Sequence, residues 1–316
     1  MVKSQPFFSI VVPTYQRPVQ LAACLQALSR LDYAREQFEV IVVDDGSKTP
    51  PEALVTSFQN SLHVRLLLHR HTGPAAARNA GAMRAQGQYL AFTDDDCAPA
   101  ADWLHALSAR FQRMPDHLIG GRIINALPEN LYSTASQLVV DYMYAYHNRG
   151  LNDANFLASN NLAVPADRFR AIGGFDTRFS LAAGEDREFC DRWRHHGYDT
   201  TYAPEVLVYH THHLILRSFW RQQGHYGRGA FRFRRARARR GQKGTRLEAP
   251  SFYLNLLRLP FSQERGARRL MLAALLLVSQ TAVATGFLLE IASQIYRRNG
   301  YGDDLASERV APVPRK

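Results

Sequence analysis

At 316 residues, with 46% hydrophobic and 21% charged residues, the chain has the composition of a folded protein, which excludes a disordered or collagen-like one. The length suits one large α/β domain with an extension, or two modest domains. Three distant cysteines without a CxxC pair predict neither a disulfide framework nor a zinc site. Together with an N-terminus that lacks the pattern of a secretory signal, they predict a cytosolic protein.

The first half of the chain alternates predicted strands with predicted helices. Apolar runs predict strands at 8–13, 38–43, 64–68 and 89–92, and helical spacing of apolar residues predicts helices at 20–31 and 75–85. Such alternation predicts right-handed crossovers and a largely parallel sheet that helices cover on both faces.

Three polar loops follow the ends of these strands. They are residues 13–17, the pair Asp44-Asp45 and the triplet Asp94-Asp95-Asp96. Ligands of such sheets bind beyond the carboxyl ends of the strands, so the three loops are expected to converge on one cleft. Three adjacent carboxylates repel one another, which predicts a divalent cation bound through oxygen. The alternative, a solvated acidic turn, is disfavoured by the apolar strand that leads into the triplet.

The second half of the chain has a different character. Its pattern predicts a short strand at 160–165, helices at 166–172 and 184–194, and a strand at 206–210. Glu185 and Asp186 stand in the first turn of the second helix, where the helix dipole favours negative charge.

Two segments near the C-terminus are unusual in charge. Residues 228–246 are rich in arginine, which indicates either a surface that binds polyanions or a solvated loop. Residues 270–289 contain no charged side chain, and they are consistent with a membrane-spanning helix, a helix in the membrane interface or a buried helix. Arginines before this segment would keep the preceding domain cytoplasmic; they are Arg258, Arg265, Arg268 and Arg269.

Six motifs in a fixed order resemble those of family 2 glycosyltransferases. They are Ser9-Ile-Val-Val-Pro-Thr-Tyr15, Val40-Ile-Val-Val-Asp-Asp-Gly-Ser47, Ala77-Arg-Asn-Ala-Gly81, Phe92-Thr-Asp-Asp-Asp96, Gly173-Gly-Phe-Asp176 and Gly184-Glu-Asp186. The resemblance covers roughly residues 7–212. It implies a GT-A fold, which is a Rossmann-like α/β domain with a mostly parallel mixed sheet flanked by helices, over residues 1–212. A basic and apolar helical extension over residues 213–316, with a possible role in membrane association, is expected to follow.

The resemblance also implies a nucleotide-sugar donor, a divalent metal and inversion at the anomeric carbon. Asp96 is implied to ligate Mn²⁺ or Mg²⁺, and Asp94 to approach the ribose and the metal. Asp95 either binds donor indirectly or faces solvent. His210 stands where related enzymes place a histidine near the metal, with three competing histidines nearby: His212, His213 and His225.

The nucleotide side of the cleft is implied by two further regions. Pro13, Thr14, Tyr15 and Arg17 match the first nucleotide loop of the family, where Tyr15 would stack on the base and Arg17 would meet phosphate. Asp45 is implied to read the uracil edge of a uridine nucleotide.

Two residues beside that region have competing interpretations. Arg78 is expected near the diphosphate, and the alternative is a structural ion pair with Asp44 or Asp45. Asp44 itself is predicted to serve the turn that follows its strand.

The catalytic base is implied to be Asp186, which would deprotonate the acceptor hydroxyl. Glu185 would orient the acceptor or interact with the helix dipole. Asn160 and Asn161 are expected on the acceptor side, and Trp103 in the core.

The region near 219–229 lacks the Gln-x-x-Arg-Trp signature of processive synthases, so transfer of one sugar is predicted. The acceptor would be a saccharide or a lipid-linked glycan, at the cytoplasmic face of an anionic membrane. Two other classes of protein are less consistent with the sequence. A nucleotidyltransferase would require a glycine-rich phosphate loop, and a nucleic-acid-binding protein would leave the acidic loops unexplained. No nucleic acid is expected as a partner.

Overall fold

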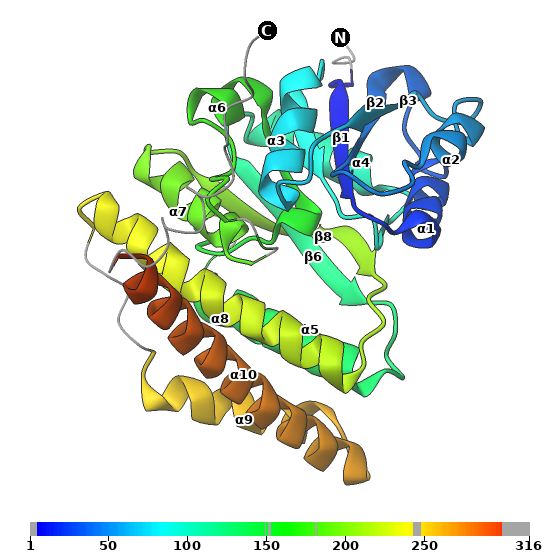
Figure 1. The fold of residues 1–316 in the computed structure, drawn as a ribbon. Coiled ribbons are helices and arrows are strands. Elements are labelled where there is room, and N and C mark those ends of the chain that lie inside the picture. Colours follow the sequence, from blue (N-terminus) through cyan, green and yellow to red (C-terminus); the bar gives the residue numbers. More distant parts are fainter. Residues whose placement is uncertain are drawn as a thin grey trace, which may run out of the picture.

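A computed structural model describes residues 5–148, 150, 153–179, 181, 183–242 and 248–298. Two layers of helices enclose one sheet, and a group of long helices lies below it (Figure 1). In chain order the elements are β1 (Phe8–Thr14), α1 (Pro18–Leu28), β2 (Phe38–Asp44), α2 (Glu52–Ser57), β3 (Val64–Leu68), α3 (Pro74–Arg84), β4 (Tyr89–Phe92), β5 (Cys97–Pro99), α4 (Trp103–Arg113), β6 (Leu118–Asn125), α5 (Leu131–His147), β7 (Leu162–Pro165), α6 (Ala166–Ala171), α7 (Glu185–His195), β8 (Thr200–His210), α8 (Leu216–Arg239), α9 (Pro250–Gln263) and α10 (Gly266–Arg298).

The sheet has eight strands in the order β3-β2-β1-β4-β7-β6-β8-β5. The first four are parallel, and the register pairs Val11 with both Ile41 and Phe92. Their carboxyl ends therefore lie at one edge, as the sequence predicted. Thr14 pairs with Asp44 at this edge.

The other half of the sheet is mixed. β7 is antiparallel to both β4 and β6, whereas β6 and β8 are parallel with an irregularity between Gly121 and Arg122. The short β5 is antiparallel to β8 and pairs Cys97 with His210. This pairing brings the segment after Asp96 beside the end of β8.

Alternate side chains of the buried strands enter two separate cores, because successive residues of a strand point to opposite faces. Ile10 and Val12 pack with helices α1 and α4 on one face. Val11 packs on the other face with Phe92, Phe189 and other residues of α3, α6 and α7. Helices on both faces of the sheet are thus confirmed.

A third core joins the C-terminal helices to α5. Leu138 of α5 packs with Phe219, Leu256, Leu272 and neighbouring apolar residues of α8, α9 and α10. α8 and α10 run side by side (Figure 1). The predicted boundary between residues 212 and 213 falls just before α8.

Several predicted elements need correction. The strand expected at 160–165 begins only at Leu162, because residues 159–161 form a 3₁₀ turn. The helix expected at 20–31 runs from Pro18 to Leu28. The sequence did not predict β5, β6, α4 or α5. Of the arginine-rich segment, residues 243–246 lie outside the described part of the chain, as do residues 299–316 of the extension.

Candidate active site

The acidic triplet forms the turn that follows β4. Asp95 is buried and accepts hydrogen bonds from the Thr14 hydroxyl at 2.7 Å and from Arg17 Nη1 at 3.2 Å. Burial and the neighbouring Asp96 raise the pKa of Asp95 to about 6, although Arg17 opposes the shift. Asp95 therefore links the first loop to the triplet. The sequence did not predict this contact.

Asp96 lies between two basic side chains. Its Oδ2 is 3.0 Å from Arg17 Nη1, and its Oδ1 is 3.2 Å from His210 Nε2. Burial alone would raise the pKa of Asp96, but His210 and Arg17 outweigh burial and hold that pKa well below its usual range. The β5–β8 pairing positions this contact, since Cys97 is opposite His210.

The donor atoms at this point fit a divalent cation. Ligand atoms of Asp96, Cys97 and His210 lie within 4.8 Å of one another. Burial raises the pKa of the Cys97 thiol well above its usual value. The carboxylate of Asp96 and the imidazole of His210 are ligand types that Mn²⁺ accepts in proteins. Asp96 and His210 are the residues that would hold the metal.

The competing histidines are resolved by geometry. His212 stacks on His210 with ring centroids 4.0 Å apart, and neither of its nitrogens has a hydrogen-bond partner among the described residues. Burial lowers the pKa of His212 to about 3. His225 is on α8, where burial and nearby arginines lower its pKa. Of the four histidines, His210 is the one in contact with Asp96.

Asp45 is held by a loop that the sequence did not indicate. Its carboxylate accepts hydrogen bonds from the backbone amides of Thr72 at 3.0 Å and Gly73 at 2.8 Å. Nδ1 of His69 and Nδ1 of His71 also lie 3.2 and 3.1 Å from it. The only signal for this contact was the position of residues 69–73, directly after the third predicted strand.

Tyr15 and Pro13 occupy different parts of the first loop. The ring of Tyr15 is 39% exposed and stacks on His71 with centroids 4.2 Å apart. Pro13 belongs to β1, where it is buried and pairs with Val43.

Arg78 connects the triplet to the acidic pair. This buried guanidinium donates to Asp94 Oδ1 at 2.5 Å and to Glu185 Oε1 at 3.1 Å. The alternative of an ion pair with Asp44 or Asp45 is therefore wrong. Asp44 instead accepts a hydrogen bond from the Ser47 amide, which confirms its role in the turn.

The acidic pair begins α7. Gly184 is the N-cap with φ of +86°, a left-handed conformation that glycine adopts without strain. Glu185 is buried, and burial together with Asp186 raises its pKa to about 7, against the effect of Arg78. Asp186 is half-buried, and burial raises its pKa too. Oε2 of Glu185 has no hydrogen-bond partner among the described residues.

The two asparagines of the 3₁₀ turn differ. Asn161 accepts from Trp103 Nε1 at 2.9 Å and donates to the Arg122 and Val206 carbonyls, so it joins strands instead of lining the acceptor side. This corrects the prediction for Asn161, whereas the buried position predicted for Trp103 is confirmed. Asn160 keeps a buried Oδ1 without a partner in the described structure.

Tyr226 of α8 is a further residue that the sequence did not reveal. Burial and the charges of Asp186, Glu185 and Asp94 raise its pKa. Gly229, one turn further along α8, approaches the backbone of Ala183 just before the acidic pair.

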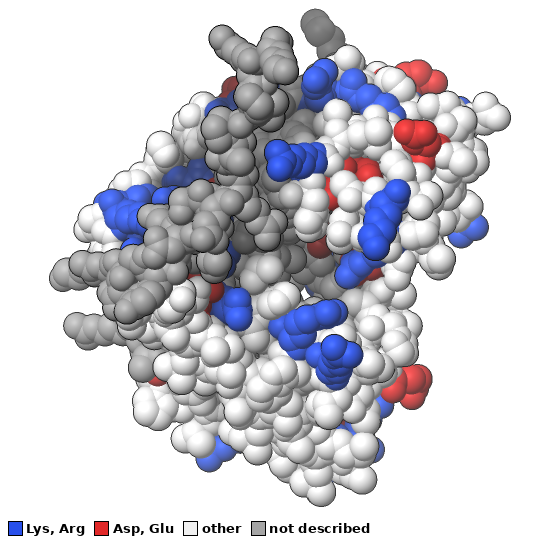
Figure 2. Space-filling model, viewed as in Figure 1, with Lys and Arg blue, Asp and Glu red and all other residues white. Residues whose placement is uncertain are grey.

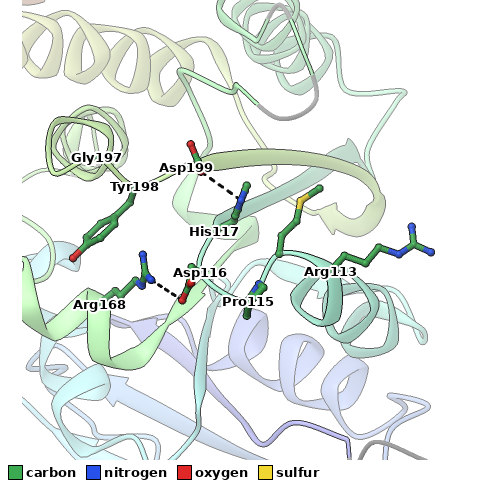
Figure 3. Close-up of a pocket in the computed structure, with 9 residues that line it drawn as sticks. Arg113, Pro115, Asp116, His117, Arg168, Gly197, Tyr198 and Asp199 are labelled. Carbon is green, nitrogen blue, oxygen red and sulfur yellow. Dashed lines mark ion pairs between the residues drawn. The ribbon is translucent and has the colours of Figure 1, made fainter.

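A separate pocket of about 260 Å³ lies at the other end of β8 (Figure 3). Two pairs of its side chains are in contact: Arg168 forms an ion pair with Asp116 at 2.7 Å, and Nε2 of His117 lies 3.7 Å from Asp199. Arg168 also lies over the ring of Tyr198. Because the acidic loops are at the opposite edge of the sheet, this pocket is not the active site.

The chain matches two family models. Residues 9–168 match glycosyl transferase family 2, and residues 89–296 match glycosyl transferase family group 2. The chain therefore belongs to glycosyl transferase family 2, and it is a glycosyltransferase.

Individual relatives agree with this membership. The chain is 27% identical to the glycosyltransferase AglE of Haloferax volcanii, over 66% of this chain and 68% of the relative. It is 29% identical to validoxylamine A glucosyltransferase of Streptomyces hygroscopicus and 30% identical to pre-mycofactocin glycosyltransferase of Mycobacterium tuberculosis. Those matches cover 63% and 64% of this chain and 54% and 44% of the respective relatives.

Solved structures share the fold. The mannosyltransferase PcManGT from Pyrobaculum calidifontis, in complex with GDP-Man and Mn²⁺, matches with a TM-score of 0.60 at 18% identity over 93% of this chain and 81% of that chain. Residues 1–349 of TarS from S. aureus match with a TM-score of 0.52 at 17% identity over 94% and 93%. The predicted GT-A fold with a helical C-terminal region is thus confirmed.

Proposed function

We propose that the protein is a metal-dependent, inverting glycosyltransferase that moves one sugar from a nucleotide-sugar donor to an acceptor hydroxyl. The observation that carries this proposal is the position of Arg78, which joins Asp94 of the triplet to Glu185 of the acidic pair. The guanidinium of Arg78 thereby contacts both the proposed donor side and the proposed acceptor side of the site. Family membership supports sugar transfer as the reaction.

The donor side consists of loops at the sheet edge. Tyr15 offers a stacking face to the base. Asp45, to which the family resemblance assigns contact with the base, is the acid that directly follows β2. The half-exposed Arg17 is suited to bind phosphate. The remaining donor-binding residues are Pro13, Thr14, Arg78, Asp94 and Asp95.

The metal site is assigned to Asp96 and His210, which would hold Mn²⁺ or Mg²⁺. Bound there, the cation would supply charge neutralisation for the departing diphosphate. The contact of 3.2 Å between the two side chains supports a shared ligand position.

The acceptor side is assigned to the acidic pair. The acceptor oxygen attacks the anomeric carbon on the side opposite the nucleotide, the bond from that carbon to the phosphate oxygen breaks, and the acceptor proton passes to Asp186. Glu185, fixed by Arg78, orients the acceptor. Displacement from the opposite side inverts the anomeric configuration.

The donor is proposed to be a UDP-sugar. Asp45 stands at the position that the family resemblance assigns to uracil recognition. A structure of TarS residues 1–349 with UDP has the same fold, with a TM-score of 0.51 at 16% identity. The complex of PcManGT with GDP-Man makes GDP-sugars the donors to test against UDP-sugars.

Nucleotide release from a panel of UDP-sugars and GDP-sugars, measured with Mn²⁺, tests the activity. Release should require Mn²⁺ or Mg²⁺, stop on addition of EDTA and fall at least about a hundredfold in Asp96→Ala. Asp32→Ala, at an exposed aspartate, is the matched control and should retain activity. Release that survives both EDTA and Asp96→Ala would contradict the metal role.

A membrane-bound acceptor is supported by α10. Within the described residues one helix, residues 266–296, is long and apolar enough to cross a membrane by length and composition. One face of this helix packs on α8 and buries Ser279 and Glu290, whereas an uncharged stripe faces outward along its length. The stripe consists of Leu270, Ala274, Leu277, Thr281, Ala284, Leu288, Ala292 and Ile295. Figure 2 shows few charged side chains over α9 and α10.

This arrangement favours a helix that lies in the membrane interface, with α8 on its inner side. Exposed arginines beside it, Arg258, Arg265 and Arg269, suit an anionic surface at the cytoplasmic face. A lipid-linked glycan would then be the acceptor, with a soluble saccharide as the alternative. Membrane attachment is peripheral in this proposal.

Flotation with anionic liposomes tests the attachment. The double variant Leu277→Asp, Leu288→Asp should lose flotation, because two charges would enter the apolar stripe. Val19→Asp, at an apolar residue that is 78% exposed on α1, should float like the unmodified protein. Equal flotation of all three proteins would contradict the membrane proposal.

The alternatives lose support at specific residues. Arg232, Arg237 and Arg240 of the arginine-rich segment pair with acids of the same chain, so they are not free for nucleic acid. The loop after β1 is not a glycine-rich phosphate loop. Its Thr14 instead donates a hydrogen bond to Asp95 and accepts one from the Asp45 amide, which disfavours a nucleotidyltransferase.

A further inference from the structure

The arginine-rich helix α8 presents one face to the helix that begins with the acidic pair. Gly229, Phe233, Arg237 and Arg240 recur at helical spacing and all contact α7 or the loop before it. Tyr226, one turn earlier, lies near Glu185 and Asp186. The contact face of α8 therefore follows α7 from the active site outward.

The first contact is a close approach of two backbones. A Cβ at Gly229 would lie 2.5 Å from the Ala183 carbonyl oxygen, and a Cβ at Gly184 would lie 3.1 Å from the Gly229 carbonyl. Glycine at 229 thus lets α8 rest directly on the N-cap of α7. The residue after that N-cap is Glu185.

The second contact is apolar and cationic. Phe233 is buried and forms a small core with Phe179 and Ala236. The guanidinium of Arg187, next to Asp186, lies over the Phe233 ring at 4.7 Å, and that of Arg237 lies at 5.8 Å. The Phe233 ring therefore contacts the first turn of α7 through Arg187 and the next turn of α8 through Arg237.

The third contact is a network of ion pairs. Arg240 joins two acids on neighbouring turns of α7, with Nη1 2.5 Å from Glu188 and Nη2 2.7 Å from Asp191. Arg237 also reaches Asp191 at 3.3 Å. Glu188 is only 1% exposed, and Arg192 is its other partner. Removal of one partner of a buried ion pair is strongly destabilising, so these ion pairs hold α7 firmly in place.

The same network extends to the loop before α7. Arg192 donates to the carbonyl oxygens of Ile172 at 2.6 Å and Gly174 at 2.5 Å. α8, α7 and residues 172–174 thus share one set of hydrogen-bonded charges around Glu188.

We propose that Arg240 is a positioning residue for sugar transfer, which acts through Glu188 and Asp191 to hold α7 so that Glu185 and Asp186 face the donor. The inference rests on the proposed function of that pair. It gives part of the arginine-rich segment a role in positioning the active site, where the sequence indicated either a polyanion-binding surface or a solvated loop. A guanidinium suits this role, because its planar fork binds two carboxylates at once.

Nearby arginines of α8 provide matched controls. Arg235 and Arg239 are exposed and have no ion pair among the described residues. The variants Arg240→Gln and Arg239→Gln remove the same charge from adjacent positions. A loss of net charge would affect both variants equally, whereas a loss of positioning would affect Arg240→Gln alone.

Nucleotide release is measured for each variant with the UDP-sugar or GDP-sugar that the unmodified protein uses. Arg240→Gln should lower kcat about tenfold or more with little change in the KM for the donor, because the acceptor side alone is displaced. Arg240→Lys should recover part of the loss.

Hydrogen exchange provides a readout that does not need turnover. Amides of residues 185–195 should exchange faster in Arg240→Gln than in Arg239→Gln, while amides of β1 and β2 should be unchanged in both. Unchanged kcat and unchanged exchange in Arg240→Gln would overturn the proposal. If the unmodified protein releases no nucleotide from any donor, the proposed function fails, and the exchange comparison still tests the contact.

Discussion

Arg78 and Glu185, 107 positions apart in the sequence, form a buried ion pair of 3.1 Å between two helices of the active site. Arg78 is on α3 and Glu185 opens α7. The same guanidinium reaches Asp94 at the end of β4. Asp94 and Glu185 raise the pKa of Arg78 further despite its burial, so its charge is permanent. The Arg78 side chain thereby fixes the distance between the acidic triplet and the acidic pair.

We expect Arg78→Lys to lower kcat/KM for nucleotide release by about a hundredfold. A lysine keeps the charge but presents a single ammonium, which cannot place two donors on Asp94 and Glu185 in the fork geometry. Arg84→Lys, at an exposed position of the same helix, is the control and should retain full activity. Activity of Arg78→Lys within a factor of two of the unmodified protein would show that charge alone is sufficient.

The rate of sugar transfer should decrease as the pH is lowered. Burial raises the pKa of both Glu185 and Asp186, and the base must be ionised to accept the acceptor proton. We therefore expect kcat to rise with pH and to level off only above the apparent pKa, which belongs to the coupled pair and lies above the usual range of a carboxyl group. A rate independent of pH between 5 and about 8 would argue against a carboxylate base.

Asp186→Asn tests the assignment within the pair. It should lower kcat about a thousandfold, because the amide cannot take up a proton, and leave the KM for the donor within a factor of about three. Asp191→Asn on the same helix is unsuitable as a control, since Asp191 belongs to the ion-pair network of α8. Asp199→Asn, at an exposed residue beyond that helix, should have normal kcat. Unchanged transfer in Asp186→Asn would assign the base elsewhere.

The sequence was informative where function depends on strand ends. Asp45 and Asp94 to Asp96 follow apolar strands, and parallel strands bring their carboxyl ends together, so local pattern and topology agree there. The mixed half of the sheet was less predictable, because β7 is antiparallel between β4 and β6 and has no helical crossover pattern to mark it. His71 and Tyr226 were missed for another reason: their positions depend on how a loop and α8 pack, which no local periodicity encodes.

The ionisation of Glu185 should lower the free energy of unfolding at neutral pH. Its pKa is about 7 in the folded protein against about 4.5 unfolded, so the folded state binds the proton more tightly and stability falls as pH rises from about 4.5 to 7. We expect Glu185→Gln, which still offers Arg78 an oxygen, to be the more stable protein at pH 8 by up to about 3 kcal/mol and to lose that advantage near pH 4. Urea unfolding at the two pH values measures the difference. Glu52→Gln, at an exposed glutamate of α2, should differ little from the unmodified protein at either pH.

The contact between α8 and α10 should depend on one glycine and not on its neighbour. A Cβ at Gly227 would lie 2.0 Å from the Val283 carbonyl oxygen, which real Cβ atoms do not tolerate, whereas a Cβ at Gly224 would lie 3.7 Å from the Ala282 carbonyl oxygen, an ordinary contact. Gly227→Ala must therefore push α10 away from α8, and we expect it to lower the free energy of unfolding by about 1–3 kcal/mol.

For Gly224→Ala, on the same helix, we expect no loss of stability. Alanine is a better helix former than glycine by about 0.5–1 kcal/mol, and it meets no obstacle at this position, so the variant should be as stable as the unmodified protein or slightly more stable. Thermal unfolding of the two variants, followed by circular dichroism, measures the difference. If both variants unfold at the same temperature, the close approach of α8 and α10 at Gly227 is wrong, and the inward face assigned to α10 is wrong with it, because the burial of Ser279 against Gln223 depends on the same approach.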